Sequence, residues 1–242
     1  MFRLTREVRL SVGSPTAAAK PLNGHAGYPP TDGFGQFLSV QVTIAGEPEP
    51  QSGYVINIQR IDQVIRRDGL ALLEQRLPPA ETASALFARL REIWPNLDRV
   101  RLGLSPYTCF SVHATEHPMV RFSHRFEFSA AHRLHNPALD AAANEALFGK
   151  CNNPNGHGHN YELEVTLRGE FPIGRLEEIV SQTVIRRLDH KFLNLDVPEF
   201  AELNPTVENI AQTIFRLLKP ELASLAAVTV WETPKTLCEY SQ

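Results

Sequence analysis

Hydrophobic and polar positions in the amino-terminal half follow two periods in a definite order. Segments in which apolar and polar residues alternate are typical of strands, because successive strand side chains point to opposite faces of a sheet. Segments in which apolar residues recur every three or four positions are typical of helices. The predicted order is strand, strand, helix, helix, strand, strand, and the segments are 3–12, 37–45, 58–65, 83–90, 98–104 and 108–114.

The carboxy-terminal half repeats this order. Its segments are 121–130, 159–168, 176–184, 210–217, 226–232 and 236–240. Three pairs of strings also align between the halves: VTIAGE with VTLRGE, VIRR with VIRR, and VRLGLSP with VTVWETP, at offsets of 123, 120 and 128 residues. Because self-similarity at a nearly constant offset is the signature of a repeat, the sequence predicts a duplicated α+β unit, with domains at 1–117 and 118–242.

The stretch FGKCNNPNGHGHNY, residues 148–161, is chemically the most distinctive part of the chain. It runs into an alternating segment, so His157 and His159 lie two apart on a predicted strand and share one face. Neutral imidazole nitrogens suit zinc, and catalytic zinc usually takes three protein ligands and keeps one position open. The pattern therefore predicts a zinc site with one further ligand. Histidines satisfied by ordinary hydrogen bonds are the alternative.

Two upstream histidines compete for the third ligand position. His132 lies in the alternating stretch FEFSAAHRLH and is preferred, because His135 falls beyond the strand pattern in the Asn136-Pro137 turn. A closed structural site, in which Cys151 is the fourth ligand, is a further alternative. Cys151 lies in a loop rich in proline, glycine and asparagine, which can bring its thiol near the metal without a bond to it.

Composition and charge restrict the class of function. The 242 residues are 43% hydrophobic and 21% charged, which is ordinary for a globular protein. A net charge of −3 without a run of five like charges gives no electrostatic footprint for nucleic acid. The first residues, MFRLTREVRLSV, lack the apolar core of a signal peptide or membrane span. We therefore expect a cytoplasmic protein, and three cysteines without paired spacing argue against a disulfide framework.

Five strings in order, FSAAHRLH, FGKCNNPNGHGHNY, LDHKFLNLDVP, TVENIA and VWETP, resemble the 6-pyruvoyl tetrahydropterin synthase family. The resemblance covers residues 120–242, about half of the chain. It implies the tunnelling fold, or T-fold, in which each unit is a four-stranded antiparallel sheet with two helices (ββααββ) and units join into barrels. Together with the repeated order of segments, this indicates two T-fold units in tandem.

The resemblance also implies roles for individual residues. Zinc is the cofactor, proton transfers need a thiol, a carboxylate and an imidazole, and the pterin is held by a glutamate and a threonine. The matching residues are His132, His157 and His159 for zinc, Cys151, Asp189 and His190 for catalysis, and Glu232 and Thr206 for the substrate. Lys150 and Arg133 flank the site as candidate contacts of a triphosphate, and simple solvated charges are their alternative.

Three of these roles have structural alternatives. Thr206 also suits a helix N-cap, and Val207 follows it where the family can carry a second hydroxyl. Asp189-His190 follows a predicted helix, whose dipole favours a histidine at its carboxyl end. Glu232 alternatively is a solvated glutamate at a strand edge.

The implied reaction converts 7,8-dihydroneopterin triphosphate to 6-pyruvoyl-tetrahydropterin with loss of triphosphate and without an external redox cofactor. The alternative within the fold is 6-carboxytetrahydropterin synthase of deazapurine (queuosine) biosynthesis. Five residues separate Cys151 from His157, as in the biopterin type, whereas the deazapurine type often has three. A non-catalytic zinc- or pterin-binding module is the alternative of another class.

The alignment of the two halves acts as an internal control. The residues opposite His132, Cys151, His157, His159 and Glu232 are Ser14, Tyr28, Phe34, Gln36 and Leu104. None of them can replace its counterpart chemically. We therefore predict that the amino-terminal half keeps the fold and lacks the site.

The resemblance finally implies assembly. Units of this family join in threes into a barrel, which removes open sheet edges, and the cysteine and the Asp-His pair of one site come from adjacent units. A working site then needs one carboxy-terminal half beside another. We predict a homotrimer in which the amino-terminal halves form one barrel and the carboxy-terminal halves form the other, with three active sites.

Overall fold

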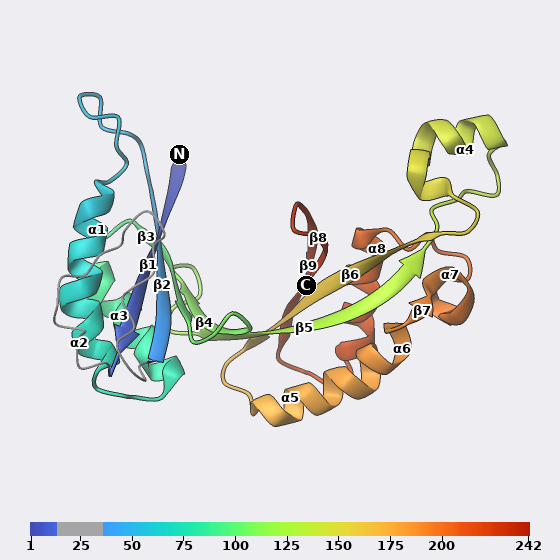
Figure 1. The fold of residues 1–242 in the computed structure, drawn as a ribbon. Coiled ribbons are helices and arrows are strands. Elements are labelled where there is room, and N and C mark those ends of the chain that lie inside the picture. Colours follow the sequence, from blue (N-terminus) through green and yellow to red (C-terminus); the bar gives the residue numbers. More distant parts are fainter. Residues whose placement is uncertain (14–35) are drawn as a thin grey trace. The chain divides into compact units, whose positions relative to one another are not determined.

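The chain forms two compact units in the computed structural model, which describes residues 1–13 and 36–242 (Figure 1). The first unit comprises Met1–Phe122 with Arg168–Glu170, and the second comprises Ser123–Leu167 with Phe171–Gln242. Within the described ranges, no helix is long and apolar enough to cross a bilayer.

The amino-terminal unit is an antiparallel sheet with helices packed on it. Its strands are hydrogen-bonded in the order β1-β2-β3-β4. The strands are β1 (Phe2–Val12), β2 (Gln36–Gly46), β3 (Leu97–Gly103) and β4 (Thr108–His113). The helices are α1 (Ile58–Val64), the π-helical turn η1 (Ile65–Gly69), α2 (Leu70–Leu73) and α3 (Pro79–Ile93). The predicted order of strands and helices is confirmed.

Alternation along these strands builds the core of the amino-terminal unit. Val8 pairs with Val40 and Val42 pairs with Val100, and all four side chains are fully buried. Helix α3, which packs on β3 and β4, adds Leu86, which is also fully buried. Because burial of one such side chain contributes about 1.5–3 kcal/mol, this packing of helix on sheet stabilises the unit without any bound group.

The carboxy-terminal unit repeats the plan with an added strand and added short helices. Its main strands are β5 (Val120–His132), β6 (His157–Arg168), β8 (Leu225–Thr233) and β9 (Thr236–Ser241), in the order β5-β6-β8-β9, and β7 (Lys191–Phe192) pairs in parallel with β5. The first helix consists of α5 (Ile173–Val180), the π-helical turn η3 (Ser181–Ile185) and α6 (Arg186–Leu188), and the second is α8 (Val207–Leu218). The short helices are α4 (Ala141–Phe148), η2 (Gly149–Asn152), α7 (Leu193–Asp196) and η4 (Pro198–Phe200).

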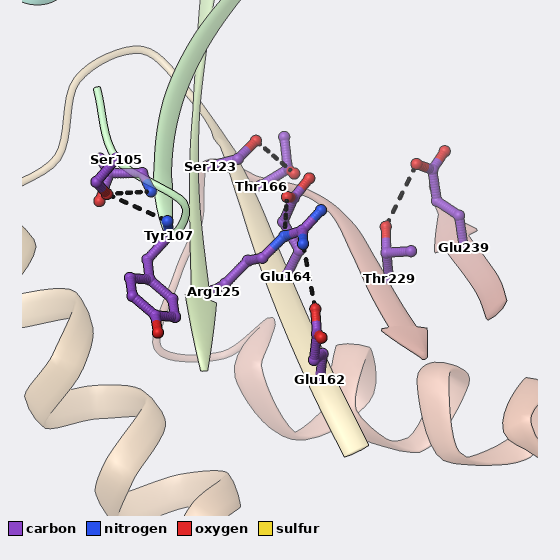
Figure 2. Close-up of polar contacts among 10 residues, drawn as sticks. Ser105, Tyr107, Ser123, Arg125, Glu162, Glu164, Thr166, Thr229 and Glu239 are labelled. Carbon is purple, nitrogen blue, oxygen red and sulfur yellow. Dashed lines mark hydrogen bonds and ion pairs between the residues drawn. The ribbon is translucent and has the colours of Figure 1, made fainter. Parts of the chain in front are cut away.

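The two faces of this second sheet differ in polarity. On the helix-covered face, Leu163 pairs with Val230 and Val165 with Val228, all fully buried. The opposite face carries hydrogen-bonded polar groups (Figure 2): Arg125 contacts Glu162 and Glu164, Ser123 contacts Thr166, and Thr229 contacts Glu239. His157 and His159 lie at the start of β6, on the face that continues with buried Tyr161 and Leu163, at the end of this apolar face.

Both units share two irregularities. The register shifts between Thr43 and Ile44 in β2 and between Thr166 and Leu167 in β6, so each sheet has a β-bulge at the same place. The first helix of each unit also contains a π-helical turn, η1 and η3. The matched bulges agree with the offsets between the strand strings. Thr43 and Thr166 lie 123 residues apart in the sequence, and the two residues left unpaired at the bulges, Asp98 of β3 and Ala226 of β8, lie 128 residues apart.

The VIRR strings, by contrast, are not structurally equivalent. In the amino-terminal unit the string 64–67 spans the start of η1, whereas in the carboxy-terminal unit the string 184–187 spans the end of η3. Alignment of these strings is therefore wrong by about one helical turn. Identity of four residues carries little information about packing here, because buried Val64 precedes η1 whereas buried Val184 lies inside η3.

Candidate active site

Four metal-ligand side chains converge at one end of the second sheet. His132 is the last residue of β5, His157 and His159 open β6, and Glu232 lies near the end of β8. One donor atom of each of the four lies within 4.8 Å of the others, and this is the one such group found among the described residues. The structure thus brings together the three histidines predicted as zinc ligands and adds a carboxylate to them.

The spacing of these donors suits a small tetrahedral cation. His132 Nε2 lies 3.0 Å from His157 Nε2 and 3.3 Å from Glu232 Oε1, and His159 Nε2 lies 3.4 Å from the same oxygen. A tetrahedron of ligands at about 2.0–2.1 Å from zinc has edges of about 3.3–3.4 Å. The donor set therefore fits zinc in both chemistry and separation.

His132 is fixed for ligation by its second nitrogen. Its Nδ1 lies 2.7 Å from the carbonyl oxygen of Pro205, so Nδ1–H donates there and the Nε2 lone pair faces the cluster. The ring is fully buried. Burial lowers the pKa of His132, which keeps the ring neutral and available as a ligand. His135, the competing ligand of the sequence, is not in the group.

Two other imidazole nitrogens of the cluster are buried without a hydrogen-bond partner, His157 Nδ1 and His159 Nε2. A buried polar atom without a partner costs about 1–3 kcal/mol. For His159 Nε2, which lies inside the donor set, a bound cation removes that cost. Burial also lowers the pKa of His159, so this ring favours the neutral form that binds metal.

Cys151 lies in the short helix η2, beside this cluster but outside the donor set. Its carbonyl oxygen accepts a hydrogen bond from the backbone N–H of Leu134, which ties η2 to the end of β5. Burial raises the pKa of the Cys151 thiol, and the negative charge of Glu232 raises it further. The fourth donor near the histidines is therefore Glu232, which speaks against the closed site with a cysteine ligand.

Asp189 and His190 lie against the backbone of β5. The carboxylate of Asp189 accepts from the backbone N–H of Ser129 at 2.8 Å and from Nδ1 of His190 at 2.7 Å, and the N–H of His190 donates to the carbonyl of Ser129. The Ser129 hydrogen bond holds the pKa of Asp189 below its usual value. The ring of His190 is 83% exposed, and neither residue belongs to the metal cluster.

Thr206 caps helix α8. Its hydroxyl accepts a hydrogen bond from the backbone N–H of Asn209 at 3.3 Å, which is the N-cap alternative noted from the sequence. The preceding residue, Pro205, is the one that orients His132. The start of α8 therefore serves the metal cluster through its backbone, and the hydroxyl of Thr206 keeps one hydrogen to donate.

Sequence reasoning missed a set of asparagines that hold the segment after β5. Asn194 accepts from the N–H of Arg133, Asn204 from the N–H of His135 and fully buried Asn144 from the N–H of Asn136. These side chains replace the strand partners that the segment lacks. Asparagines in short helices and loops have no periodic signal, although Asn194 falls within the string LDHKFLNLDVP.

Tyr161 is a second omission. It lies two residues after His159 on the same face of β6, is fully buried, stacks on Phe128 at 4.9 Å and has an unpartnered hydroxyl. Burial raises its pKa, so the phenol stays protonated. Strand alternation predicts its inward position but gives no sign that its hydroxyl faces a polar cluster.

Comparison with known proteins places these features in a family. The family model of 6-pyruvoyl tetrahydropterin synthase matches residues 121–242, which contain every residue of the cluster. The chain belongs to this synthase family. A 6-pyruvoyl tetrahydrobiopterin synthase of Drosophila melanogaster is 43% identical over 52% of this chain and 82% of its own.

Two solved structures extend the comparison to the fold. The 6-pyruvoyl tetrahydropterin synthase of Caenorhabditis elegans matches 52% of this chain and 96% of its own, with a TM-score of 0.50 and 40% identity. A uricase of Arthrobacter globiformis matches 100% of this chain and 90% of its own, with a TM-score of 0.52 and 9% identity. The synthase fold accounts for the carboxy-terminal unit, and the uricase likeness confirms a tandem T-fold along the whole chain.

The amino-terminal unit of this family member carries other residues at the corresponding positions. When the strands of the two units are aligned at their shared β-bulge, Gln36 corresponds to His159 and Leu104 corresponds to Glu232. Neither offers the ligand or the carboxylate of its counterpart. The remaining predicted counterparts, Ser14, Tyr28 and Phe34, lie outside the described residues.

Proposed function

We propose that the protein is a zinc-dependent carbon-oxygen lyase that converts 7,8-dihydroneopterin triphosphate to 6-pyruvoyl-tetrahydropterin with loss of triphosphate. The observation that carries this is the convergence of His132, His157, His159 and Glu232, with Cys151 beside them, in the half of the chain that matches the synthase family. Relatives at about this level of identity bear the name of that synthase.

The three histidines would hold the metal, with His132 locked by Pro205 as the most rigid ligand. When bound, zinc supplies Lewis-acid polarisation of the substrate's side-chain hydroxyls and positive charge that lowers the pKa of a neighbouring thiol. Cys151 would then remove a proton from the carbon next to the polarised hydroxyl. Burial raises the pKa of the Cys151 thiol, so this step would need positive charge nearby.

Asp189 and His190 would return a proton to the intermediate. The carboxylate is held by Ser129 and orients the imidazole through Nδ1, which leaves Nε2 for proton transfer. Because hydrogen is only redistributed between the side chain and the ring, no external oxidant or reductant is needed. The 83% exposure of His190 in a single chain supports a site completed by a neighbouring copy.

Glu232 and Thr206 would hold the pterin. A carboxylate can accept two hydrogen bonds from the amino group and a ring N–H of the pterin, a match that a neutral side chain cannot reproduce. Glu232 lies at the mouth of the cluster with 20% of its side chain exposed, so it can reach a ligand there. Thr206 would add its remaining hydroxyl hydrogen.

The unit boundaries and the assembly belong to the same proposal. We assign residues 1–117 to a T-fold repeat that lacks the site and 118–242 to the catalytic repeat. The assembly is a homo-oligomer, in its specific form the homotrimer with one barrel for each set of halves. Among the described residues, β1 and β9 are the end strands of the hydrogen-bonded order, which supports oligomerisation because strand edges favour association.

The deciding experiment is an assay of the pure protein with added zinc and 7,8-dihydroneopterin triphosphate, with products identified by mass spectrometry. We expect the pyruvoyl product and free triphosphate, and loss of turnover in Cys151→Ala. A carboxylated product would instead assign the 6-carboxytetrahydropterin reaction. Zinc and pterin binding without turnover would leave a binding module.

A further inference from the structure

A cavity of about 390 Å³ lies at one end of the core of the amino-terminal unit. Its volume is within the range of small-ligand sites, about 300–1,000 Å³. Residues of β1, β2 and β3, of the end of α2 and of the start of α3 line it, so it lies between the sheet and the helices. Among the described residues, its leucines are Leu38, Leu73, Leu77, Leu102 and Leu104.

This cavity corresponds in position to the metal cluster of the carboxy-terminal unit. With the strands aligned at their shared β-bulge, Leu38 stands in β2 where Tyr161 stands in β6. Gln36, which also lines the cavity, stands in the same way for His159. The amino-terminal unit has therefore kept a cavity at this place, with a wall that is mainly apolar and lacks the imidazoles.

Arg76 is the one charged residue in the described lining of this cavity. Its φ is 54°, in the left-handed region, which is unfavourable for a residue with a Cβ atom. Among the non-glycine residues that the structure describes, His190 alone shares this conformation, and each of the two lies in the turn after the first helix of its unit. Because strained residues concentrate at binding and catalytic sites, the conformation of Arg76 indicates a function for this side chain.

The guanidinium of Arg76 lies near the end of β1. A Cβ atom added to Gly13, another lining residue, would lie 3.6 Å from its Nη2. Within the described part of the chain, this guanidinium has no hydrogen-bond or ion-pair partner, and no carboxylate lines the cavity. Arg76 and the neighbouring Leu77 are both exposed, so they lie at the opening. The cavity thus has an apolar interior and a cation with unused donors at its opening.

We infer that this cavity binds a small carboxylate with an apolar body. The leucines would surround the body of the ligand, and Arg76 would receive the carboxylate through two parallel N–H···O hydrogen bonds. A single guanidinium matches a single negative charge, whereas a cationic ligand would be repelled. The site goes beyond the proposed function, because all its described lining residues belong to the amino-terminal unit.

The test is calorimetric titration of the full zinc-loaded chain with phenylacetate and, separately, with the neutral phenylacetamide. We expect the carboxylate to bind about tenfold more tightly than the amide, a difference of about 1.4 kcal/mol. Arg76→Gln should remove that preference. Arg60→Gln, which removes an exposed charge from α1 of the same unit but outside the lining, is the matched control and should leave binding unchanged.

A second variant tests the same site from its opening. Leu77 is 38% exposed, so Leu77→Asp should fold, and its negative charge should weaken binding of phenylacetate more than binding of phenylacetamide. Equal affinity of the wild type for the two probes, no binding of either, or unchanged phenylacetate binding in Arg76→Gln would overturn the inference. Phenylacetate binding that is lost in His157→Ala and kept in Arg76→Gln would place the probe at the metal cluster and overturn it as well.

Discussion

His190 holds a backbone conformation that few residues adopt. Its φ is 56°, in the left-handed region, where a side chain with a Cβ atom costs about 1–2 kcal/mol. Its backbone N–H donates to the carbonyl oxygen of Ser129, and the N–H of Ser129 donates to the carboxylate of the adjacent Asp189, so these two hydrogen bonds hold the segment there. This strained conformation places the imidazole next to Asp189, so the position of the His190 side chain costs local stability.

Replacement of His190 by glycine and by alanine separates strain from chemistry. Both variants lose the imidazole, and we expect both to lose activity by at least about 100-fold, the lower range for a general acid. His190→Gly should be more stable than His190→Ala by about 1 kcal/mol, because glycine tolerates positive φ. Urea unfolding measures the difference. Alanine as stable as glycine would show that the backbone is not strained there.

The metal ligands give a second prediction at this scale. His157→Ala should lose zinc and activity together, since two histidines hold catalytic zinc poorly. Glu232→Gln should keep stoichiometric zinc and lose affinity for the pterin, if its role is the substrate contact. Metal analysis and pterin fluorescence titration give the two readouts. Zinc loss in Glu232→Gln would move this carboxylate into the ligand set, and zinc retention in His157→Ala would support the closed site.

Acid should destabilise the metal-free protein through its buried histidines. Burial lowers the pKa of His132 and of His159 below the ordinary value of 6.5. The unfolded chain then binds more protons than the folded chain, so stability is present above pH 6.5 and is lost as pH falls below it, by up to about 1.4 kcal/mol per pH unit for each proton. Urea unfolding between pH 8 and 5 measures this, and His132→Asn should flatten the slope.

The sequence predicts that the three histidines converge, because strand alternation and spacing place them. His157 and His159 share a face by parity, and His132 ends a segment with the same alternation. The asparagine contacts could not be foreseen, because Asn194 and Asn204 act across 61 and 69 residues, Asn144 acts across 8, and the segment that they hold has no periodicity. Glu232 was foreseen as a pterin contact but not as a neighbour of two imidazoles.

At the scale of elements, the start of helix α8 combines a structural and a functional position. Thr206 caps the helix, Pro205 orients His132, and Asn209 donates to the carbonyl oxygen of Asn204. The helix buries Ile210 and Ile214 against the sheet, which fixes the position of its first turn. A change at the cap therefore affects the metal cluster as well as the helix.

Thr206→Ala should lower the free energy of unfolding by about 1 kcal/mol, the usual loss when an N-cap hydroxyl is removed. Thr206→Ser keeps the acceptor and is the matched control, with stability near that of the wild type. A rise in KM in Thr206→Ala alone would support the additional contact with the pterin. Unchanged stability in the alanine variant would contradict the cap.

Periodicity located the long elements and missed the short ones. The core positions of β1, β6, α3 and α8 repeat at regular intervals, so their segments were predictable. Helices α4 and α7 and strand β7 are too short to show a period and depend on tertiary contacts. The π-helical turns interrupt the helical period, which is why string identity misaligned the first helices.

At the scale of the whole molecule, the separation of His190 from the metal cluster is the feature with the clearest consequence. If a neighbouring chain completes each site, Cys151→Ala and His190→Ala chains are both inactive alone but mixed oligomers contain some intact sites. Refolding of the two variants together should restore part of the activity. Light scattering should give about three times 27.1 kDa. A monomeric mass, or no rescue in mixed oligomers, would contradict the assembly.

The shared β-bulge and the shared π-helical turn indicate that both features were present before the unit was duplicated. Each accommodates one extra residue in an element whose ends are fixed by packing. Independent additions at two matched places in both halves require four separate events, whereas one ancestral unit that gained both and was then copied requires two. The π-helical turn η1 of the amino-terminal half is then inherited from that unit and did not arise after the copying.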